Sequence, residues 1–254
     1  MEESITTDMA EPVGADMPRL RVTFLGHSAF LLAYDTAAFV FDYAGDASAL
    51  TERLAEFAQV YVFASHGHGD HYTRGVFDWR GHPSITYVLS YDITDALSPL
   101  DGEAYRVAVV SPGMTKEFDR ATVRAYESTD LGVSFLVKIM GAELNVFHAG
   151  DLNLWHWRGE STPREIEAAE EAFDRAIQPI IGEPIDVCMF PVDPRLGAMH
   201  DLGADIFISK LRPRVFIPMH FWGRGDVAAE FARKTMPRGT VVVPLTAAGE
   251  EFIL

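Results

Sequence analysis

Short apolar segments, rich in β-branched and aromatic residues, recur along this chain and constrain its fold more than any other feature. They predict strands at 20–26, 29–34, 38–43, 59–65, 84–90, 105–110, 121–127, 133–140, 143–149, 185–192, 214–221 and 240–246. Apolar residues at helical spacing predict helices at 48–58, 163–181, 204–213 and 226–235. Strands dominate the first part and mix with helices later. We therefore expect an α+β fold with two sheets packed face to face and helices outside.

The helix expected at 163–181 has the clearest start signal in the chain. Thr162 is a typical N-cap residue, Pro163 suits the first helical turn, and Glu165 completes a capping-box pattern. The spacing therefore predicts that this helix begins directly after Thr162.

The chain divides simply. Residues 1–18 are polar and acidic, and we expect them to form a flexible N-terminal leader. No linker-like tract follows, so residues 19–254 are expected to form a single domain. The leader lacks the apolar core of a signal peptide, and no run of eighteen apolar residues indicates a membrane span. The single cysteine, Cys188, excludes an internal disulfide, so a cytoplasmic location is expected.

The charge balance limits the partners. The formal net charge is −16, which argues against non-specific nucleic-acid binding, because such binding needs Lys and Arg to neutralise phosphates. We expect a small-molecule substrate rather than a nucleic acid or a membrane, and we leave a homo-oligomer open.

Residues 63–72 read FASHGHGDHY and place His66, His68, Asp70 and His71 directly after an apolar strand. Alternate residues of an extended segment project to the same side, so His66 and His68 can share one ion. Asp70 and His71 follow the turn and can hold a second ion. The intervening glycines, Gly67 and Gly69, are expected to let the backbone turn sharply and approach closely. Imidazole and carboxylate ligands suit Zn, Fe or Mn.

Two distant segments offer further ligands. Asp151 follows a predicted strand and a glycine, where its carboxylate could bridge two ions, and His220 ends another predicted strand. Each is a weak signal alone, because a buried histidine or a Gly-Asp turn is common. Together with the histidine cluster they indicate a metal site.

The chain resembles the metallo-β-lactamase superfold, and within it the lactonase-like branch of metal-dependent hydrolases. The matching segments are LGHSAFLL (25–32), FDY (41–43), the His-x-His-x-Asp-His run, HAGD (148–151) and IPMHF (217–221). The resemblance implies an αββα sandwich and one or two divalent ions, Zn, Mn or Fe. It further implies His66 and His68 at a first ion, Asp151 between the two ions, and Asp70, His71 and His220 at the second.

One departure from the superfold concerns the first ion, which usually has a third histidine. The equivalent region, 124–135, contains no histidine. Asp130 could replace it as an oxygen ligand, and His148 is the alternative. A carboxylate at this position would favour Mn or Fe over Zn.

Three further residues are candidates for the pocket. His27 either has a catalytic role, orienting substrate near the metals, or is a structural core histidine. Trp155, in a small aromatic cluster, either walls the substrate pocket or packs in the core. Arg195 either binds a substrate carboxylate or phosphate or forms a surface salt bridge.

The leading functional hypothesis is a metal-dependent hydrolase in which a metal-bound water attacks an ester, lactone or phosphodiester substrate. Asp70 is the expected catalytic group, because it can orient the nucleophile and take its proton. A degenerate or metal-sensing binding module and a di-iron redox protein are the alternatives.

Overall fold

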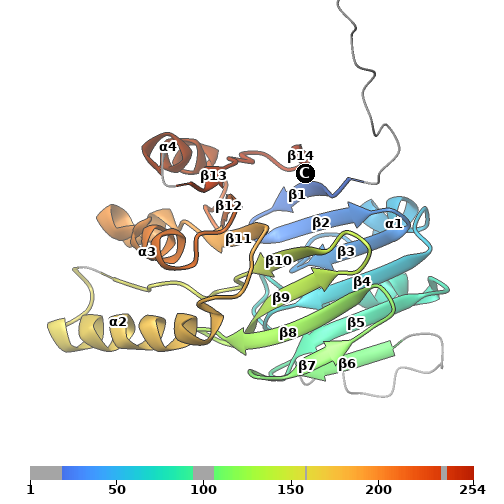
Figure 1. The fold of residues 1–254 in the computed structure, drawn as a ribbon, viewed down its shortest axis with the longest axis horizontal. Helices are drawn as coiled ribbons and strands as arrows, with labels where there is room; N and C mark the ends of the chain where they lie inside the picture. The colour runs from blue at the N-terminus through green and yellow to red at the C-terminus, as the bar shows by residue number, and fades with distance from the viewer. Residues whose placement is uncertain (1–18, 94–105, 158, 236–238) are drawn as a thin grey trace, which may run out of the picture.

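The computed structural model describes residues 19–93, 106–157, 159–235 and 239–254. The expected leader, 1–18, lies outside the described residues, and the division into a leader and one domain stays a prediction. Two seven-stranded sheets pack face to face, with helices on both outer faces (Figure 1). This is the expected αββα sandwich.

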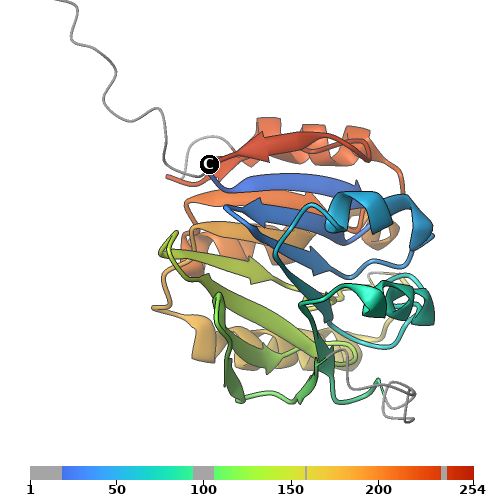
Figure 2. The same cartoon turned by 90° about the vertical axis from the view of Figure 1, so that its right-hand side faces the viewer.

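The first sheet has the strand order β14-β1-β2-β3-β4-β5-β6. Its strands are β1 (Arg21–Gly26), β2 (Ala29–Tyr34), β3 (Ala37–Phe41), β4 (Gln59–Ala64), β5 (Ile85–Ser90), β6 (Arg106–Val110) and β14 (Glu251–Ile253). Helix α1 (Ser48–Leu54) and the 3-10 helix η1 (Arg74–Gly81) cover its outer face, as Figure 2 shows.

The second sheet has the strand order β13-β12-β11-β10-β9-β8-β7. Its strands are β7 (Thr115–Glu117), β8 (Ala121–Glu127), β9 (Val133–Ile139), β10 (Leu144–His148), β11 (Val187–Pro191), β12 (Val215–Met219) and β13 (Val241–Val242). Helices α2 (Pro163–Ile177), α3 (Leu202–Leu211) and α4 (Gly225–Thr235) lie on its side, with the 3-10 segments η3 (Gln178–Ile180) and η4 (Pro194–Met199).

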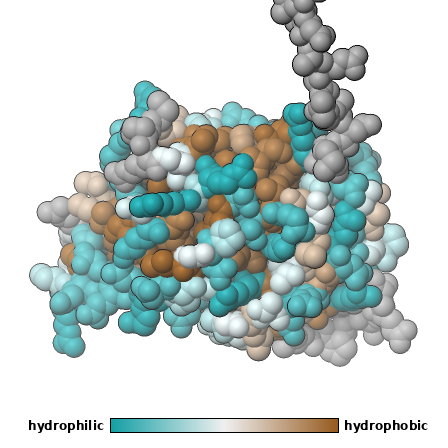
Figure 3. Space-filling view, viewed as in Figure 1, coloured by the Kyte–Doolittle hydropathy of each residue, from teal (hydrophilic) through white to brown (hydrophobic). Residues whose placement is uncertain are grey.

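The inner strands of the first sheet are buried on both faces and alternate between two apolar cores. In β3, Phe39 and Phe41 face the core between the sheets, whereas Val40 faces the core beneath α1 and η1. Side chains along a strand alternate in direction, so a continuous apolar run serves both cores. The face seen in Figure 1 is apolar near its middle and polar around much of its rim (Figure 3).

Several expected boundaries were wrong. The strand expected at 240–246 shortens to β13, because Pro244 lacks the N–H that would extend the ladder, and β14 closes the first sheet instead. Helix α1 ends at Leu54, and α2 ends at Ile177 just before the Gln178-Pro179 pair, since the residue before proline disfavours helix. The sequence patterns did not predict η1, β7 or β14. Among the described residues, no helix is long and apolar enough to cross a membrane.

Strand direction brings distant segments to one edge of the sandwich. In the first sheet, β1 and β3 run the same way because β2 is antiparallel to both, and β4 runs parallel to β3. In the second sheet, β8 and β10 run the same way because β9 is antiparallel to both, and β11 and β12 run parallel to β10. The segments that follow these strands carry His27, Asp42, His66, Asp130, Asp151, Asp193 and His220.

Candidate metal centre

The histidine cluster forms a tight turn directly after β4. The amides of His71 and Tyr72 donate to the carbonyl of His68 at 3.0 and 2.9 Å, which reverses the chain. His66 and His71 are fully buried, whereas His68 is half exposed. The ring centre of His66 nevertheless lies 4.7 Å from that of His68 and 4.2 Å from that of His71. The sequence-adjacent imidazoles therefore face one region.

The glycines that permit close approach are not the expected ones. Neither Gly67 nor Gly69 has a positive φ. A Cβ added at Gly69 would meet nothing within 4 Å, and one at Gly67 would meet only a side-chain oxygen of Asp92, at 3.3 Å, and a side-chain carbon of Ile93. At Gly132 an added Cβ would lie 2.0 Å from the carbonyl oxygen of Ser65, and at Gly150 it would lie 2.7 Å from the Cβ of Ser65. Loops from the second sheet thus press directly on the start of the histidine turn.

A first group of metal-type donors consists of His66, His68, Asp130 and Asp151, whose ligand atoms lie within 4.8 Å of one another. Asp130 Oδ2 lies 3.6 Å from His68 Nδ1, and both side chains are about half exposed. The carboxylate expected in place of a third histidine therefore lies within this group, and this group opens to the pocket.

His148, the alternative to Asp130, is not available as a ligand. Its Nε2 lies 2.8 Å from the carbonyl of Ser28, and its Nδ1 accepts the amide of Gly150. It is fully buried and its ring stacks on Phe41, 5.1 Å away. His148 therefore holds the sheets together behind the centre.

A second group consists of His27, Asp70, His71 and His220, also within 4.8 Å of one another. Three of these were expected at the second ion. His27 joins them with its Nε2 3.1 Å from Asp70 Oδ2 and its ring 4.1 Å from that of His220. Its backbone carbonyl accepts the amide of His220 at 2.9 Å, which ties the β1–β2 turn to the end of β12.

Asp151 lies between the two groups. Its Oδ1 is 3.0 Å from His71 Nε2 and 3.3 Å from His220 Nε2, whereas its Oδ2 is 3.5 Å from His66 Nε2. One carboxylate oxygen thus faces each group, which is the geometry that a bridging ligand requires.

The far side of each buried imidazole is held by the protein. His66 Nδ1 contacts Ser65 Oγ at 3.0 Å, His71 Nδ1 contacts Asp42 Oδ2 at 2.8 Å, and His220 Nδ1 contacts Asp193 Oδ2 at 3.0 Å. The near side forms no well-aligned hydrogen bond: the three Nε2 atoms lie within ion-pair distance of the Asp151 carboxylate, yet they and Asp151 Oδ1 are buried without a hydrogen-bond partner in the described structure. Metal-binding histidines characteristically use their second nitrogen in this way. The residues fit a metal ion.

Burial and pairing set the charges at the centre. Burial opposes ionisation of Asp151, but the imidazoles of His71 and His220 outweigh it and hold the pKa of Asp151 well below its usual range. Burial lowers the pKa of His27 to about 4, and the neighbouring imidazoles add to this effect. Burial opposes charge on His71 as well, but Asp151 and Asp42 raise its pKa, so an ion must displace a proton there.

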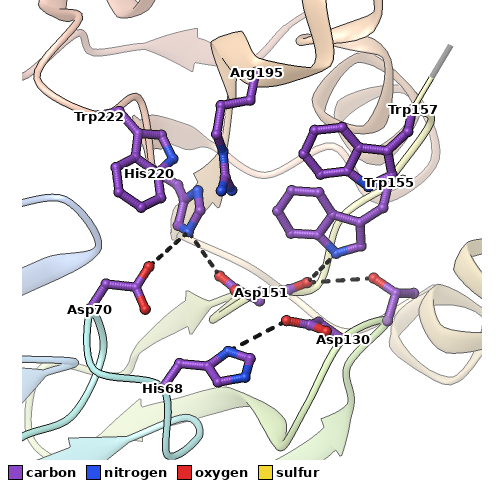
Figure 4. A pocket seen from close by; sticks show the side chains of 10 residues that line it. His68, Asp70, Asp130, Asp151, Trp155, Trp157, Arg195, His220 and Trp222 are labelled. Atoms are coloured by element: carbon purple, nitrogen blue, oxygen red, sulfur yellow. Dashed lines mark hydrogen bonds and ion pairs between the residues drawn. The ribbon is translucent and has the colours of Figure 1, made fainter. Parts of the chain in front are cut away.

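A pocket of about 400 Å³ opens over the centre (Figure 4). Its lining includes Arg195 and three tryptophans, Trp155, Trp157 and Trp222. Trp155 therefore lies in the pocket wall rather than in the core. The indole of Trp155 donates to the carbonyl of Asp151 at 3.0 Å, which anchors this wall to the centre. Arg195 both lines the pocket and pairs with Asp193.

Two buried carboxylates at the centre, Asp42 and Asp193, were not predicted from the sequence. Asp42 accepts from the amide of Ser65 at 2.7 Å, from its hydroxyl, and from His71. Asp193 accepts from His220 and Arg195. Asp42 directly follows β3, Asp193 follows β11 after one residue, and Asp151 follows β10 after two, so a position just after an apolar strand is the signal that could have identified them.

The layered fold defines the class of this protein, which has the metallo-β-lactamase fold. Two solved structures share it over most of their length. Igni18, a metallo hydrolase from Ignicoccus hospitalis, has a TM-score of 0.68 and 20% identity, covering 93% of this chain and 98% of its own. The metallo-β-lactamase fold protein YhfI from Bacillus subtilis has a TM-score of 0.63 and 12% identity, covering 93% and 99%.

Sequence comparison finds relatives described as UPF0173 metal-dependent hydrolases. The one from Heliobacterium modesticaldum is 26% identical over 218 residues, covering 80% of this chain and 82% of its own. The one from Carboxydothermus hydrogenoformans is 25% identical over 255 residues, covering 92% and 100%. No protein-family model matches the sequence. The lactonase-like branch stays a prediction.

Proposed function

We propose that this protein is a metal-dependent hydrolase that cleaves an ester, lactone or phosphodiester bond with one or two divalent ions at the edge of the sandwich. The observation that carries the proposal is a set of four buried atoms that converge without forming a hydrogen bond: Nε2 of His66, His71 and His220, and Oδ1 of Asp151. Buried polar atoms without partners are costly, and coordination to a cation satisfies all four.

A divalent ion bound there would polarise the scissile carbonyl or phosphoryl group and lower the pKa of a coordinated water. Asp70 lies beside this point, partly exposed to the pocket, with Oδ2 3.9 Å from the Nε2 atoms of His71 and His220. We propose that this carboxylate accepts a proton from the attacking group, a role that typically contributes about 10²–10⁴-fold in rate.

The donor sets support an asymmetric pair of ions. The group around His71 and His220 has three imidazoles and one carboxylate besides Asp151, whereas the group around His66 includes the exposed carboxylate of Asp130. Oxygen ligands favour Mn or Fe over Zn, so we propose Mn or Fe at the more exposed position.

The relatives support the reaction class rather than a substrate. Those described as metal-dependent hydrolases align with most of this chain. A diphosphatase of the PhnP family shares the fold with a TM-score of 0.56 at 13% identity, which keeps phosphate esters among the candidates beside lactones.

The test is hydrolysis by purified protein loaded with Mn, Zn or Fe. Panels of lactones, aryl esters and bis(p-nitrophenyl) phosphate are assayed with and without chelator. We expect chelator-sensitive turnover, and we expect Asp70→Ala to lower kcat by about 100-fold or more. Asp174→Ala is the matched control, because Asp174 pairs with Lys210 at the surface of α2.

Absence of metal-dependent turnover on every panel would contradict the proposal. Less than one bound ion per chain without activity would favour the binding-module alternative. An iron-loaded protein with a visible absorption band and no hydrolysis would favour the redox alternative.

A further inference from the structure

Among the described residues that line the pocket, Arg195 is the only lysine or arginine. Only some of its guanidinium donors form hydrogen bonds within the protein. Nε lies 3.0 and 2.9 Å from the two oxygens of Asp193, and Nη2 pairs with the same carboxylate. No described residue accepts a hydrogen bond from Nη1. The side chain is 44% exposed, so donors remain free toward the pocket.

The position of this guanidinium is coupled to the candidate metal centre. Asp193 is fully buried, and its Oδ2 accepts from His220 Nδ1 at 3.0 Å as well as from Arg195. One buried carboxylate therefore orients both an imidazole of the centre and the free edge of the guanidinium. Little side-chain entropy remains to be lost when Arg195 binds a ligand.

Flat apolar surfaces flank Arg195. Its guanidinium carbon lies 4.5 Å from the ring centre of Trp222 and 5.7 Å from that of Trp157. Trp157 stacks on Trp155 with ring centres 6.0 Å apart and planes 7° from parallel. Figure 4 shows the guanidinium between Trp222 on one side and the Trp155–Trp157 pair on the other. Three of the four tryptophans in the chain thus gather around one cation.

Arg195 is a positive charge in an otherwise acidic pocket. The chain carries a formal net charge of −16, and Asp70, Asp130 and Asp151 line the same pocket. Divalent ions held by these carboxylates would offset their charge at the centre, and Arg195 supplies positive charge on the pocket wall beside it. A guanidinium with free donors in a partly desolvated wall is suited to a carboxylate or phosphate.

We propose that the substrate carries a carboxylate or phosphate group that Arg195 binds, joined to a flat apolar body that lies against Trp155, Trp157 and Trp222. This inference rests on the proposed hydrolase function, because it names the substrate class of the same pocket. The bond to be hydrolysed would then lie at the candidate metal centre while Arg195, on the wall of the same pocket, binds the anion.

The test is calorimetric binding of three matched, non-hydrolysable probes to the metal-loaded protein: 2-naphthoate, 2-naphthylphosphonate and uncharged 2-naphthamide. We expect Arg195→Gln to weaken binding of the preferred anion by about 10–100-fold and to leave the amide unchanged. Arg195→Lys should restore part of the loss, since it keeps the charge without the planar fork. The two anions distinguish carboxylate from phosphate recognition.

Arg224→Gln is the matched control, because Arg224 lies two residues after Trp222 but pairs with Asp226 outside the pocket. Equal anion affinity in wild type and Arg195→Gln would overturn the inference and leave Arg195 as a partner of Asp193 alone. Loss of bound ions in both Arg195 variants would overturn it too, by making Arg195 a support of His220.

The two proposals fail separately. Arg195-dependent anion binding without metal-dependent turnover would reject the hydrolase and retain the anion site. Metal-dependent turnover of neutral and anionic esters alike, unaffected by Arg195→Gln, would retain the hydrolase and reject the anion site.

Discussion

Single residues at the centre adopt backbone conformations that side chains usually avoid. His27, Asp42, His220 and Trp222 have φ values of 50°, 43°, 62° and 51°. Such left-handed conformations cost on the order of 1–3 kcal/mol each and persist where the surroundings enforce them. Here the backbone hydrogen bond from the His220 amide to the His27 carbonyl and the buried contacts of Asp42 hold these conformations in place. Strain therefore concentrates where the donor atoms converge.

The first prediction concerns His27. We expect His27→Ala to weaken binding of one ion by about 10–100-fold, because the second donor group loses an imidazole. Competitive metal titration with a chromophoric chelator measures this affinity. His82→Ala is the control, since His82 contacts the carbonyl of Phe57 at 3.0 Å and lies in no candidate metal group. Equal affinities in the two variants would show that His27 only orients its neighbours.

At the scale of elements, the centre depends on loops of one sheet pressing on a strand end of the other. The amide of Val133, at the start of β9, donates to the carbonyl of Ser65 at 2.9 Å. Gly132 and Gly150 make this approach possible, because any Cβ there would collide with Ser65 or His66. The histidine turn is thus shaped from outside as well as by its own sequence.

The second prediction follows from this contact. Gly132→Ala should lower the free energy of unfolding by about 3–5 kcal/mol, because a positive φ and a steric overlap add together. Gly113→Ala isolates the first cause, since Gly113 has φ +85° but an added Cβ would meet nothing within 4 Å. About 1–2 kcal/mol is expected for it. Denaturant unfolding measures both, and equal losses would contradict the close packing.

At the scale of the whole molecule, the candidate metal centre joins the two sheets. His27, His66 and His71 follow strands of the first sheet, whereas Asp151 and His220 follow strands of the second. Each donor group draws side chains from both sheets, so an ion in either group links the halves of the sandwich, and its site exists only in the folded chain. Metal binding should therefore stabilise the fold by mass action.

The third prediction is a metal-dependent melting temperature. At an ion concentration 100 times Kd, the gain is about 2.7 kcal/mol, which corresponds to about 5–10 °C for a chain of this size. Thermal unfolding with Mn and with chelator measures the difference. Asp151→Ala should lose most of it, because that variant removes the ligand between the two groups. An identical melting temperature with and without ion in the wild type would contradict a shared ion.

Local signals in the sequence were sufficient for much of the fold. The capping box of α2 forms as expected, with Glu165 N donating to Thr162 Oγ1 at 3.3 Å and Thr162 N donating back to Glu165 at 2.7 Å. Most strands matched their apolar runs, because burial on both faces leaves an unbroken hydrophobic signal. Short edge strands such as β7 and β14 lack that signal, since most of their residues are exposed.

The sequence by itself determined the two-sheet architecture and marked His66–His71 as metal-type residues, because apolar runs and the histidine cluster are continuous along the chain. Asp151 and His220 gained weight only beside that cluster. The tertiary structure alone decided that His27 joins the second donor group, that Asp130 rather than His148 faces the first, and that Asp42 and Asp193 orient the imidazoles. These relations depend on which strand ends meet at one edge. Which strand ends lie together is determined by the order of the strands in each sheet and by how the sheets pack. Local sequence patterns do not contain that information.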